Sequence, residues 1–171
     1  CHSLGVHLIG KEILKEASHI ILINSFHNFI PTNNESKITI RTLRRMENKI
    51  NTNEVRFMLE EFISRSFMPN PVDPKFKSIF NLNSKKINLK SLLKDFQKLY
   101  SQNSTFNLFS KHVEVLIITS KNDLILKEYA SNEFINLLNN SQIIKPKLVQ
   151  IENQGHFIDN NSIVKILKNW L

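Results

Sequence analysis

The chain has 171 residues, of which 41% are hydrophobic and 22% charged. This length and composition are typical of a folded domain with a sizeable core, and they exclude a disordered or collagen-like chain. The single cysteine, Cys1, excludes an internal disulfide framework and favours a reducing, cytoplasmic compartment. No apolar run approaches the roughly 18 residues of a membrane span, so the sequence predicts no transmembrane segment.

The net charge of +8 is unevenly distributed along the chain. Between Ser36 and Tyr100 there are 14 Lys and Arg residues against 6 Asp and Glu, whereas the remainder holds 9 of each sign. This asymmetry suggests an acidic partner or a membrane surface for the middle segment. A lysine-rich face that is simply solvated is the alternative.

Both ends of the chain have the pattern of alternating helices and buried strands. A helix is expected over Gly5–Ala17 and a strand over Ile20–Ile23. After the middle segment, we expect further strands and helices in alternation: Val113–Ile118, Lys127–Asn139, Lys147–Ile151 and Asn161–Trp170. Short, wholly apolar strands alternating with helices predict an α/β fold with a parallel sheet.

The middle segment is instead predicted to be helical. Leu43, Met46 and Ile50 repeat at helical spacing. Asn51 and Glu54 resemble a capping box that would start a second helix ending near Phe67. Prolines at 69, 71 and 74 break the pattern. A third helix is expected over Asn88–Tyr100, with Lys90, Lys94 and Lys98 in one stripe, which we interpret as a solvated face.

Three residues have the order and the positions of a catalytic triad. Cys1-His2-Ser3-Leu4-Gly5 matches the nucleophile motif G-x-S-x-G at the serine and the second glycine, with cysteine replacing the first glycine. Asp123 follows one apolar strand and His156 follows the next, at the carboxyl ends where catalytic groups gather in open sheets. Asp123 could alternatively cap a turn and His156 could be a surface residue, but the combination favours Ser3, Asp123 and His156 as nucleophile, acid and base.

From Cys1 to the C-terminus the sequence resembles the α/β-hydrolase family. Ser120–Asp123 is similar to the family's acid turn and Gln154–Phe157 to its histidine turn. The resemblance implies a hydrolase core over residues 1–30 and 111–171, with a helical cap inserted over residues 31–110. Because such enzymes have several strands before the nucleophile, we expect the chain to be the C-terminal part of a larger fold.

A narrower resemblance is to the pimeloyl-acyl-carrier-protein methyl ester esterases of bacterial biotin synthesis. It depends on the stretches Ile23–Phe26, Phe29–Pro31 and Arg41–Met46. It implies a serine carboxylester hydrolase that needs no metal or cofactor, with an acyl ester substrate attached to an acidic carrier protein. The backbone N–H of Leu4 would donate to the oxyanion, helped by the helix that follows it.

Further residues are expected to contact the substrate or its carrier. The candidates are the cap arginines, which suit phosphate recognition, and two residues bordering the pocket: Arg41, Arg44, Arg45, Arg56, His2 and Phe26. Cys1 and the other histidines lack metal-ligand spacing, so we expect no metal site.

Three alternatives remain open. The chain could be an esterase or lipase of small acyl esters, or a truncated remnant without catalysis. A nucleic-acid-binding module is disfavoured because the aromatic residues of the middle segment follow its apolar stripes and form no stacking platform.

Overall fold

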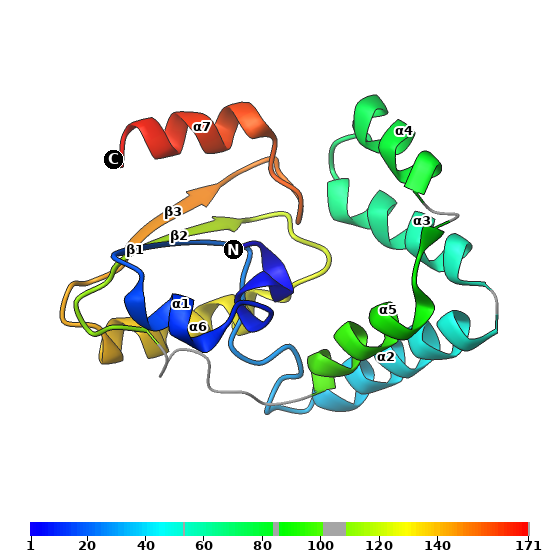
Figure 1. Cartoon of the computed structure of the whole chain (residues 1–171), viewed down its shortest axis with the longest axis horizontal. Helices are drawn as coiled ribbons and strands as arrows, with labels where there is room; N and C mark the ends of the chain where they lie inside the picture. The colour runs from blue at the N-terminus through cyan, green and yellow to red at the C-terminus, as the bar shows by residue number, and fades with distance from the viewer. Residues whose placement is uncertain (53, 84–85, 101–108, 171) are drawn as a thin grey trace.

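The computed structural model describes residues 1–52, 54–83, 86–100 and 109–170. In these residues, three parallel strands form a sheet in the order β1-β2-β3 (Figure 1). The strands are β1 (His19–Ile23), β2 (Glu114–Ser120) and β3 (Lys147–Ile151). Residues Ile20 and Ile118 pair with Val115 and Val149, which aligns the carboxyl ends of all three strands at one edge. The predicted parallel α/β sheet is therefore confirmed.

Helices cover both faces of this sheet, because the strand residues are apolar on both sides. On one face, Leu116 and Ile118 pack with α7 (Asn160–Lys168). On the other, Val115 and Ile117 belong to a core that includes residues of α1 (Lys11–Glu16) and α6 (Glu128–Ser141). Figure 1 shows α7 on one side of the strands and α1 and α6 on the other. The central strand β2 is consequently buried from Val115 to Ser120.

Between β1 and β2, the described residues form four helices and a short 3-10 helix, which make a separate helical layer beside the sheet (Figure 1). They are α2 (Ser36–Asn51), α3 (Val55–Phe67), α4 (Pro74–Asn83), α5 (Leu89–Gln97) and η3 (Lys98–Tyr100). This layer, called the cap below, has its own core of Leu43, Ile50, Met58 and Phe96. The expected division into residues 1–30, 31–110 and 111–171 stays a prediction, since its second boundary falls beside residues 101–108, outside the described residues.

The first predicted helix, Gly5–Ala17, is wrong as a single element. The chain forms a 3-10 helix, η1 (Ser3–His7), and then the short helix α1. Gly10 has an extended backbone (φ −60°, ψ 139°) and separates the two. As a result the segment has no single apolar face: Leu8 and Ile13 are exposed, whereas Leu14 is buried.

Two predictions in the cap also need correction. Asn51 ends α2 and does not start the next helix, because the buried Ile50 extends the apolar face of α2 to this point. Glu54 precedes α3 without a side-chain capping bond. The prolines were expected only to interrupt the helices, but Pro74 is the first residue of α4. Its missing N–H costs nothing at this position. Asp73, directly before it, accepts a 2.7 Å hydrogen bond from the Lys75 N–H. No helix in the described part of the chain is long and apolar enough to cross a bilayer.

Candidate active site

Ser3 lies at a sharp turn beside the carboxyl end of β1. The Ile23 N–H donates to the Cys1 carbonyl at 2.8 Å, and His2 forms a parallel bridge with Ile23. Cys1 and His2 thus extend the sheet beyond β1 and lead directly into Ser3, whose φ is +52°. A positive φ is unfavourable for serine and is the strained backbone expected of a nucleophile elbow. By contrast, a Cβ on Gly5 would meet nothing within 4 Å, so the described residues do not require glycine there.

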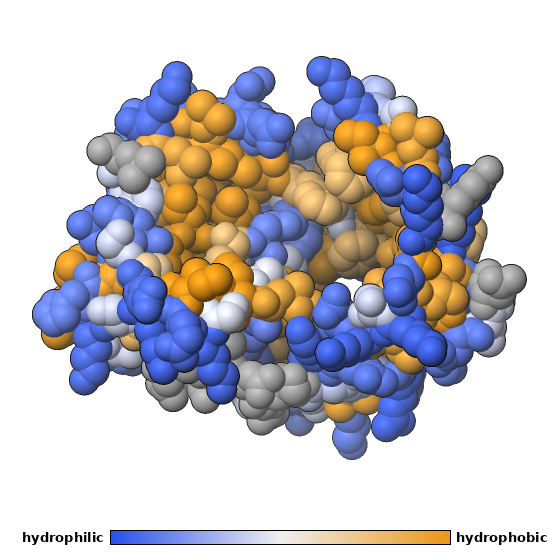
Figure 2. All heavy atoms as spheres, in the orientation of Figure 1, coloured by the Kyte–Doolittle hydropathy of each residue, from blue (hydrophilic) through white to orange (hydrophobic). Residues whose placement is uncertain are grey.

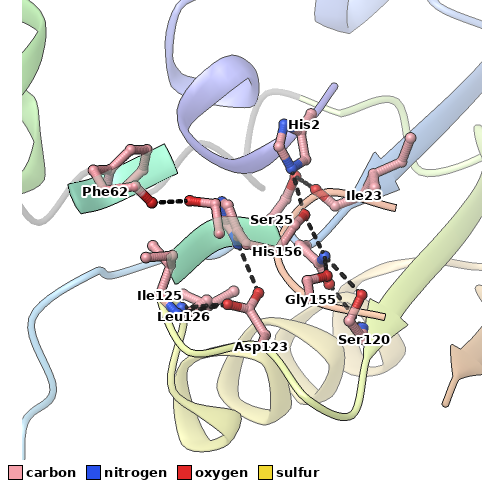
Figure 3. A network of polar contacts seen from close by, with 12 residues as sticks. His2, Ile23, Ser25, Phe62, Ser120, Asp123, Ile125, Leu126, Gly155 and His156 are labelled. Carbon is pink, nitrogen blue, oxygen red and sulfur yellow. Dashed lines mark hydrogen bonds and ion pairs between the residues drawn. The ribbon is translucent and has the colours of Figure 1, made fainter. Parts of the chain in front are cut away.

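Asp123 is fixed by the turn that follows β2. Its Oδ1 accepts the N–H groups of Ile125 and Leu126 at 2.8 and 2.9 Å. Its Oδ2 lies 2.6 Å from Nδ1 of His156 (Figure 3). One carboxylate oxygen therefore holds the turn while the other faces the histidine, which joins the capping role and the proposed acid role in one residue.

His156 is almost completely enclosed, with 2% of its surface exposed. Because the carboxylate of Asp123 only accepts hydrogen bonds, the proton of a neutral His156 ring lies on Nδ1. This leaves Nε2 as the proton acceptor of the ring. The Asp123–His156 pair has the geometry of an oriented general base.

No hydrogen bond connects the Ser3 hydroxyl to His156 in the part of the chain that the structure describes. The elbow instead contacts the histidine turn through His2, whose Nε2 lies 2.9 Å from the His156 carbonyl oxygen. The two rings are 4.8 Å apart, and the His2 ring is 5.2 Å from that of Phe157. Burial lowers the pKa of His2, and the neighbouring His156 lowers it further.

The cap touches the histidine turn directly. The Phe157 N–H donates to the Ser66 carbonyl of α3 at 2.9 Å, and the side-chain amide of Asn70 donates to the Asn153 carbonyl at 2.8 Å. The ring of Phe157 also packs against two cap rings in tilted arrangements, with centroid distances of 5.0 Å to Phe67 and 5.2 Å to Phe76. The cap and the histidine turn are therefore packed directly against each other.

Sequence reasoning missed Asn24, the residue that follows β1. Asn24 is 1% exposed and its side chain hydrogen-bonds both Ser120 and the His156 carbonyl. Figure 3 shows Ser120, Gly155 and His156, from which its partners come, together in one polar network. The signal in the sequence was an asparagine at the end of an apolar strand, which is also typical of an ordinary turn.

The other candidates lie in different surroundings. Leu4 is the second residue of η1, where N–H groups lack an acceptor within the helix. The helix after it is too short to add a substantial dipole. Phe26 is 2% exposed and packs with Leu126 and Ala130, so its ring is part of the core in this conformation.

The cap arginines are all exposed: Arg41, Arg44 and Arg45 on α2, and Arg56 on α3. Arg56 is paired with Glu60 at 3.0 Å. Their side chains are therefore on the surface of the cap. Their expected contact with a carrier stays a prediction.

Two hollows in the described part of the chain lie in the cap and beside the elbow. The larger, about 450 Å³, is lined by residues of α3, α4 and the connection between them. None of the candidate site residues lines it. The smaller, about 180 Å³, lies beside the elbow and is lined by His2, Ile23 and Phe157 together with the start of α7. Among the described residues, no group of three or more His, Cys, Asp or Glu side chains could hold a metal ion.

Comparison with solved structures identifies the fold. The chain is similar to an esterase (EaEST) from Exiguobacterium antarcticum, with a TM-score of 0.73 and 15% identity, and to a bromoperoxidase from Bacillus anthracis, with 0.69 and 16%. It is also similar to Est816, described as an N-acyl homoserine lactone degrading enzyme, with a TM-score of 0.55 and 12% identity.

These matches cover 98–99% of this chain but only 63–65% of the three solved chains. No family model and no curated protein matches the sequence. The chain has the α/β-hydrolase fold and corresponds to a C-terminal portion of it. Because one fold hosts many reactions, the chemistry of a chain depends on its site and not on its fold alone.

Proposed function

We propose that this chain provides the triad of a serine carboxylester hydrolase. The observation that supports the proposal most is the 2.6 Å contact of Asp123 with His156, at the sheet edge where Ser3 has a positive φ. Esterases among the structural neighbours agree with it at the level of fold.

In this mechanism Ser3 attacks the ester carbonyl while Nε2 of His156 takes its proton. Asp123 keeps the ring in the Nδ1–H form and stabilises its positive charge. The Leu4 N–H donates to the oxyanion. His156 then gives its proton to the departing alcohol, and water, activated in the same way, hydrolyses the acyl-enzyme.

The narrower proposal is that the ester is carrier-linked, such as the methyl ester of pimeloyl-acyl carrier protein. It is supported by the charge excess of the cap and by the exposure of Arg41, Arg44 and Arg45. An acidic carrier would be attracted by this surface. A small soluble ester would not depend on it.

The mechanism is tested in the full-length protein with a serine-directed fluorophosphonate. We expect covalent labelling at Ser3, and loss of both labelling and ester hydrolysis in Ser3→Ala. An active Ser3→Ala variant would contradict the proposal that Ser3 is the nucleophile. A Ser3 that is not labelled, in a protein that does not hydrolyse esters, would favour a non-catalytic remnant. A salt-sensitive shift of a labelled oligonucleotide would favour the nucleic-acid alternative.

The carrier proposal is tested by charge reversal at Arg44 and Arg45. We expect a higher KM for a carrier-linked ester and an unchanged KM for a small ester. Reversal of Lys165 and Lys168 on α7 is the matched control, because it changes the net charge equally outside the cap. An equal effect on both esters would contradict carrier docking.

A further inference from the structure

Asn24 is a buried polar residue in an uncommon backbone conformation. It follows β1 directly, is 1% exposed and has a φ of +41°. Asparagine tolerates a positive φ better than most residues do. A buried amide, however, is costly unless its donors and acceptor are satisfied, so its partners indicate what it does.

Its side chain connects the ends of two strands. The Asn24 Oδ1 accepts the Ser120 N–H at 2.8 Å, and its Nδ2 donates to the Ser120 hydroxyl at 3.0 Å. Ser120 is the last residue of β2, three positions before Asp123. The Asn24 N–H also donates to the Ile118 carbonyl at 2.9 Å. Asn24 therefore fixes the place from which the Asp123 turn leaves the sheet.

The same amide also holds the histidine turn. Nδ2 donates to the His156 carbonyl oxygen at 2.8 Å and approaches that of Gly155 at 3.4 Å. The His156 carbonyl is in contact with His2 Nε2 as well, at 2.9 Å. Since a carbonyl oxygen only accepts, the His2 Nε2 is protonated in this contact. The carbonyl oxygen of His156 is therefore contacted by two side chains: Asn24, which follows β1, and His2, which precedes Ser3 in the elbow.

We propose that Asn24, with His2 as its partner on the same carbonyl, is a positioning residue that sets the place of His156 relative to Asp123 and Ser3. This inference rests on the proposed esterase function. Asn24 touches no reacting atom in this arrangement. It acts through the backbone carbonyl of His156, which its Nδ2 contacts at 2.8 Å.

The size of the effect follows from the demands of proton transfer. The base has to lie within hydrogen-bond reach of the nucleophile, and a displacement of about 1 Å costs about 100-fold in rate. Without the amide, the His156 carbonyl keeps only the contact to His2. We therefore expect slower chemistry with unchanged substrate binding.

Two variants of the full-length protein separate the contacts of Asn24 from its backbone. Asn24→Gly permits the positive φ and removes every side-chain contact. Asn24→Asp keeps the shape and the acceptor for the Ser120 N–H but loses the amide donor to His156. Leu138→Ala is the control, because it opens the buried core against α6 and lowers the melting temperature without touching the site.

Fluorophosphonate labelling of Ser3 and the pH profile of kcat/KM are the first readouts. We expect both Asn24 variants to react about 10- to 100-fold more slowly, with KM within about twofold and the acid limb of the profile displaced. Leu138→Ala should keep the parental profile at temperatures where it is folded. Folded Asn24 variants with the parental rate and profile would overturn the proposal.

The NMR signal of the His156 Nδ1–H proton is a readout independent of activity. Its loss or fast exchange in both Asn24 variants, but not in Leu138→Ala, supports the positioning role. This readout does not depend on labelling: a parent protein that fails to label would reject only the esterase proposal. An unchanged signal would overturn positioning. If neither Asn24 variant folds, His2→Phe removes the other donor to the same carbonyl. We then expect the same loss or fast exchange of the Nδ1–H signal, and an unchanged signal in His2→Phe would overturn the proposal.

Discussion

Gly155 lies directly against the backbone of Met68 at the end of the cap helix α3. A Cβ placed on Gly155 would clash with the Met68 carbonyl oxygen and would lie 2.6 Å from the Ser66 carbonyl oxygen. Both obstacles are backbone atoms, which cannot rotate away as a side chain can. The glycine before the histidine is therefore required by the close approach of the cap, and its φ is not positive.

We accordingly predict that Gly155→Ala separates the cap from the histidine turn. The methyl group should destabilise the fold by about 1–3 kcal/mol and reduce esterase activity by displacing His156. Thermal melting and fluorophosphonate labelling measure the two effects. The control is Gly10→Ala, since a Cβ there meets nothing within 4 Å. Equal melting temperatures for the two variants would contradict the predicted clash.

Asp123→Asn should abolish most of the proposed activity while leaving the turn intact. An asparagine oxygen can still accept the Ile125 and Leu126 N–H groups, but its NH₂ would then face Nδ1 of His156. The neutral ring would then carry its proton on Nε2. A protonated Nε2 cannot accept the hydroxyl proton of Ser3. We expect about a 10⁴-fold lower kcat.

The matched control for this substitution is Asp73→Asn. Asp73 makes a similar turn, with its Oδ1 accepting the Lys75 N–H at 2.7 Å, but this turn precedes α4 and does not follow a strand of the sheet. A kcat near the parental value in Asp123→Asn would show that the aspartate only caps its turn, which is the alternative that the sequence left open.

The sequence predicted what depends on local pattern. Strand β3 has the predicted bounds, Lys147–Ile151, and the Asp123–His156 pair could be expected because each residue follows an apolar strand in a parallel sheet. Asn24 could not be found in this way, since its partners Ser120 and His156 lie 96 and 132 residues away. No periodicity encodes such contacts.

The helix α4 was missed for a different reason. Pro74 was interpreted as a breaker, although proline at a first helical position after a capping aspartate is a helix start. The break at Gly10 was missed because the apolar residues around it fit one helical stripe. At Pro74 the helix-start signal, and at Gly10 the glycine itself, are better local indicators than the broader pattern of proline breaks and helical spacing.

The aromatic contact between cap and core gives a third prediction. Phe76 of α4 lies 5.2 Å from Phe67 and from Phe157, so it fills the space between the cap and the histidine turn. Phe76→Ala should lower the free energy of unfolding by about 1–3 kcal/mol, less than for a fully buried ring because Phe76 is partly exposed. Hydrogen exchange should rise in α4 and in the turn after β3.

Phe80→Ala is the comparison for this variant, because Phe80 lies on the same helix and lines the 450 Å³ hollow within the cap. It should loosen α4 without affecting residues 153–157. If hydrogen exchange at residues 153–157 is the same in both variants, the aromatic contact does not couple the cap to the histidine turn.

Three partly buried histidines predict how stability depends on pH. Burial is the largest cause of a lowered pKa for His2, His7 and His27, from an ordinary value of 6.5. The unfolded chain therefore binds protons at a higher pH than the folded chain does. Stability from the neutral rings is present above about pH 6.5 and is lost as the pH falls below it, by up to about 1.4 kcal/mol per pH unit for each proton taken up.

His7→Gln tests this dependence, because glutamine can still donate to the Phe26 carbonyl, 2.9 Å from His7 Nε2, but cannot titrate. Urea unfolding between pH 7.5 and about 5 should show a smaller loss of stability for the variant than for the parent. The same substitution at the exposed His112 controls for replacing a histidine in general. A parental slope in His7→Gln would mean that the ring accepts its proton in the folded state as readily as in the unfolded chain, and that burial at this position does not exclude the charge.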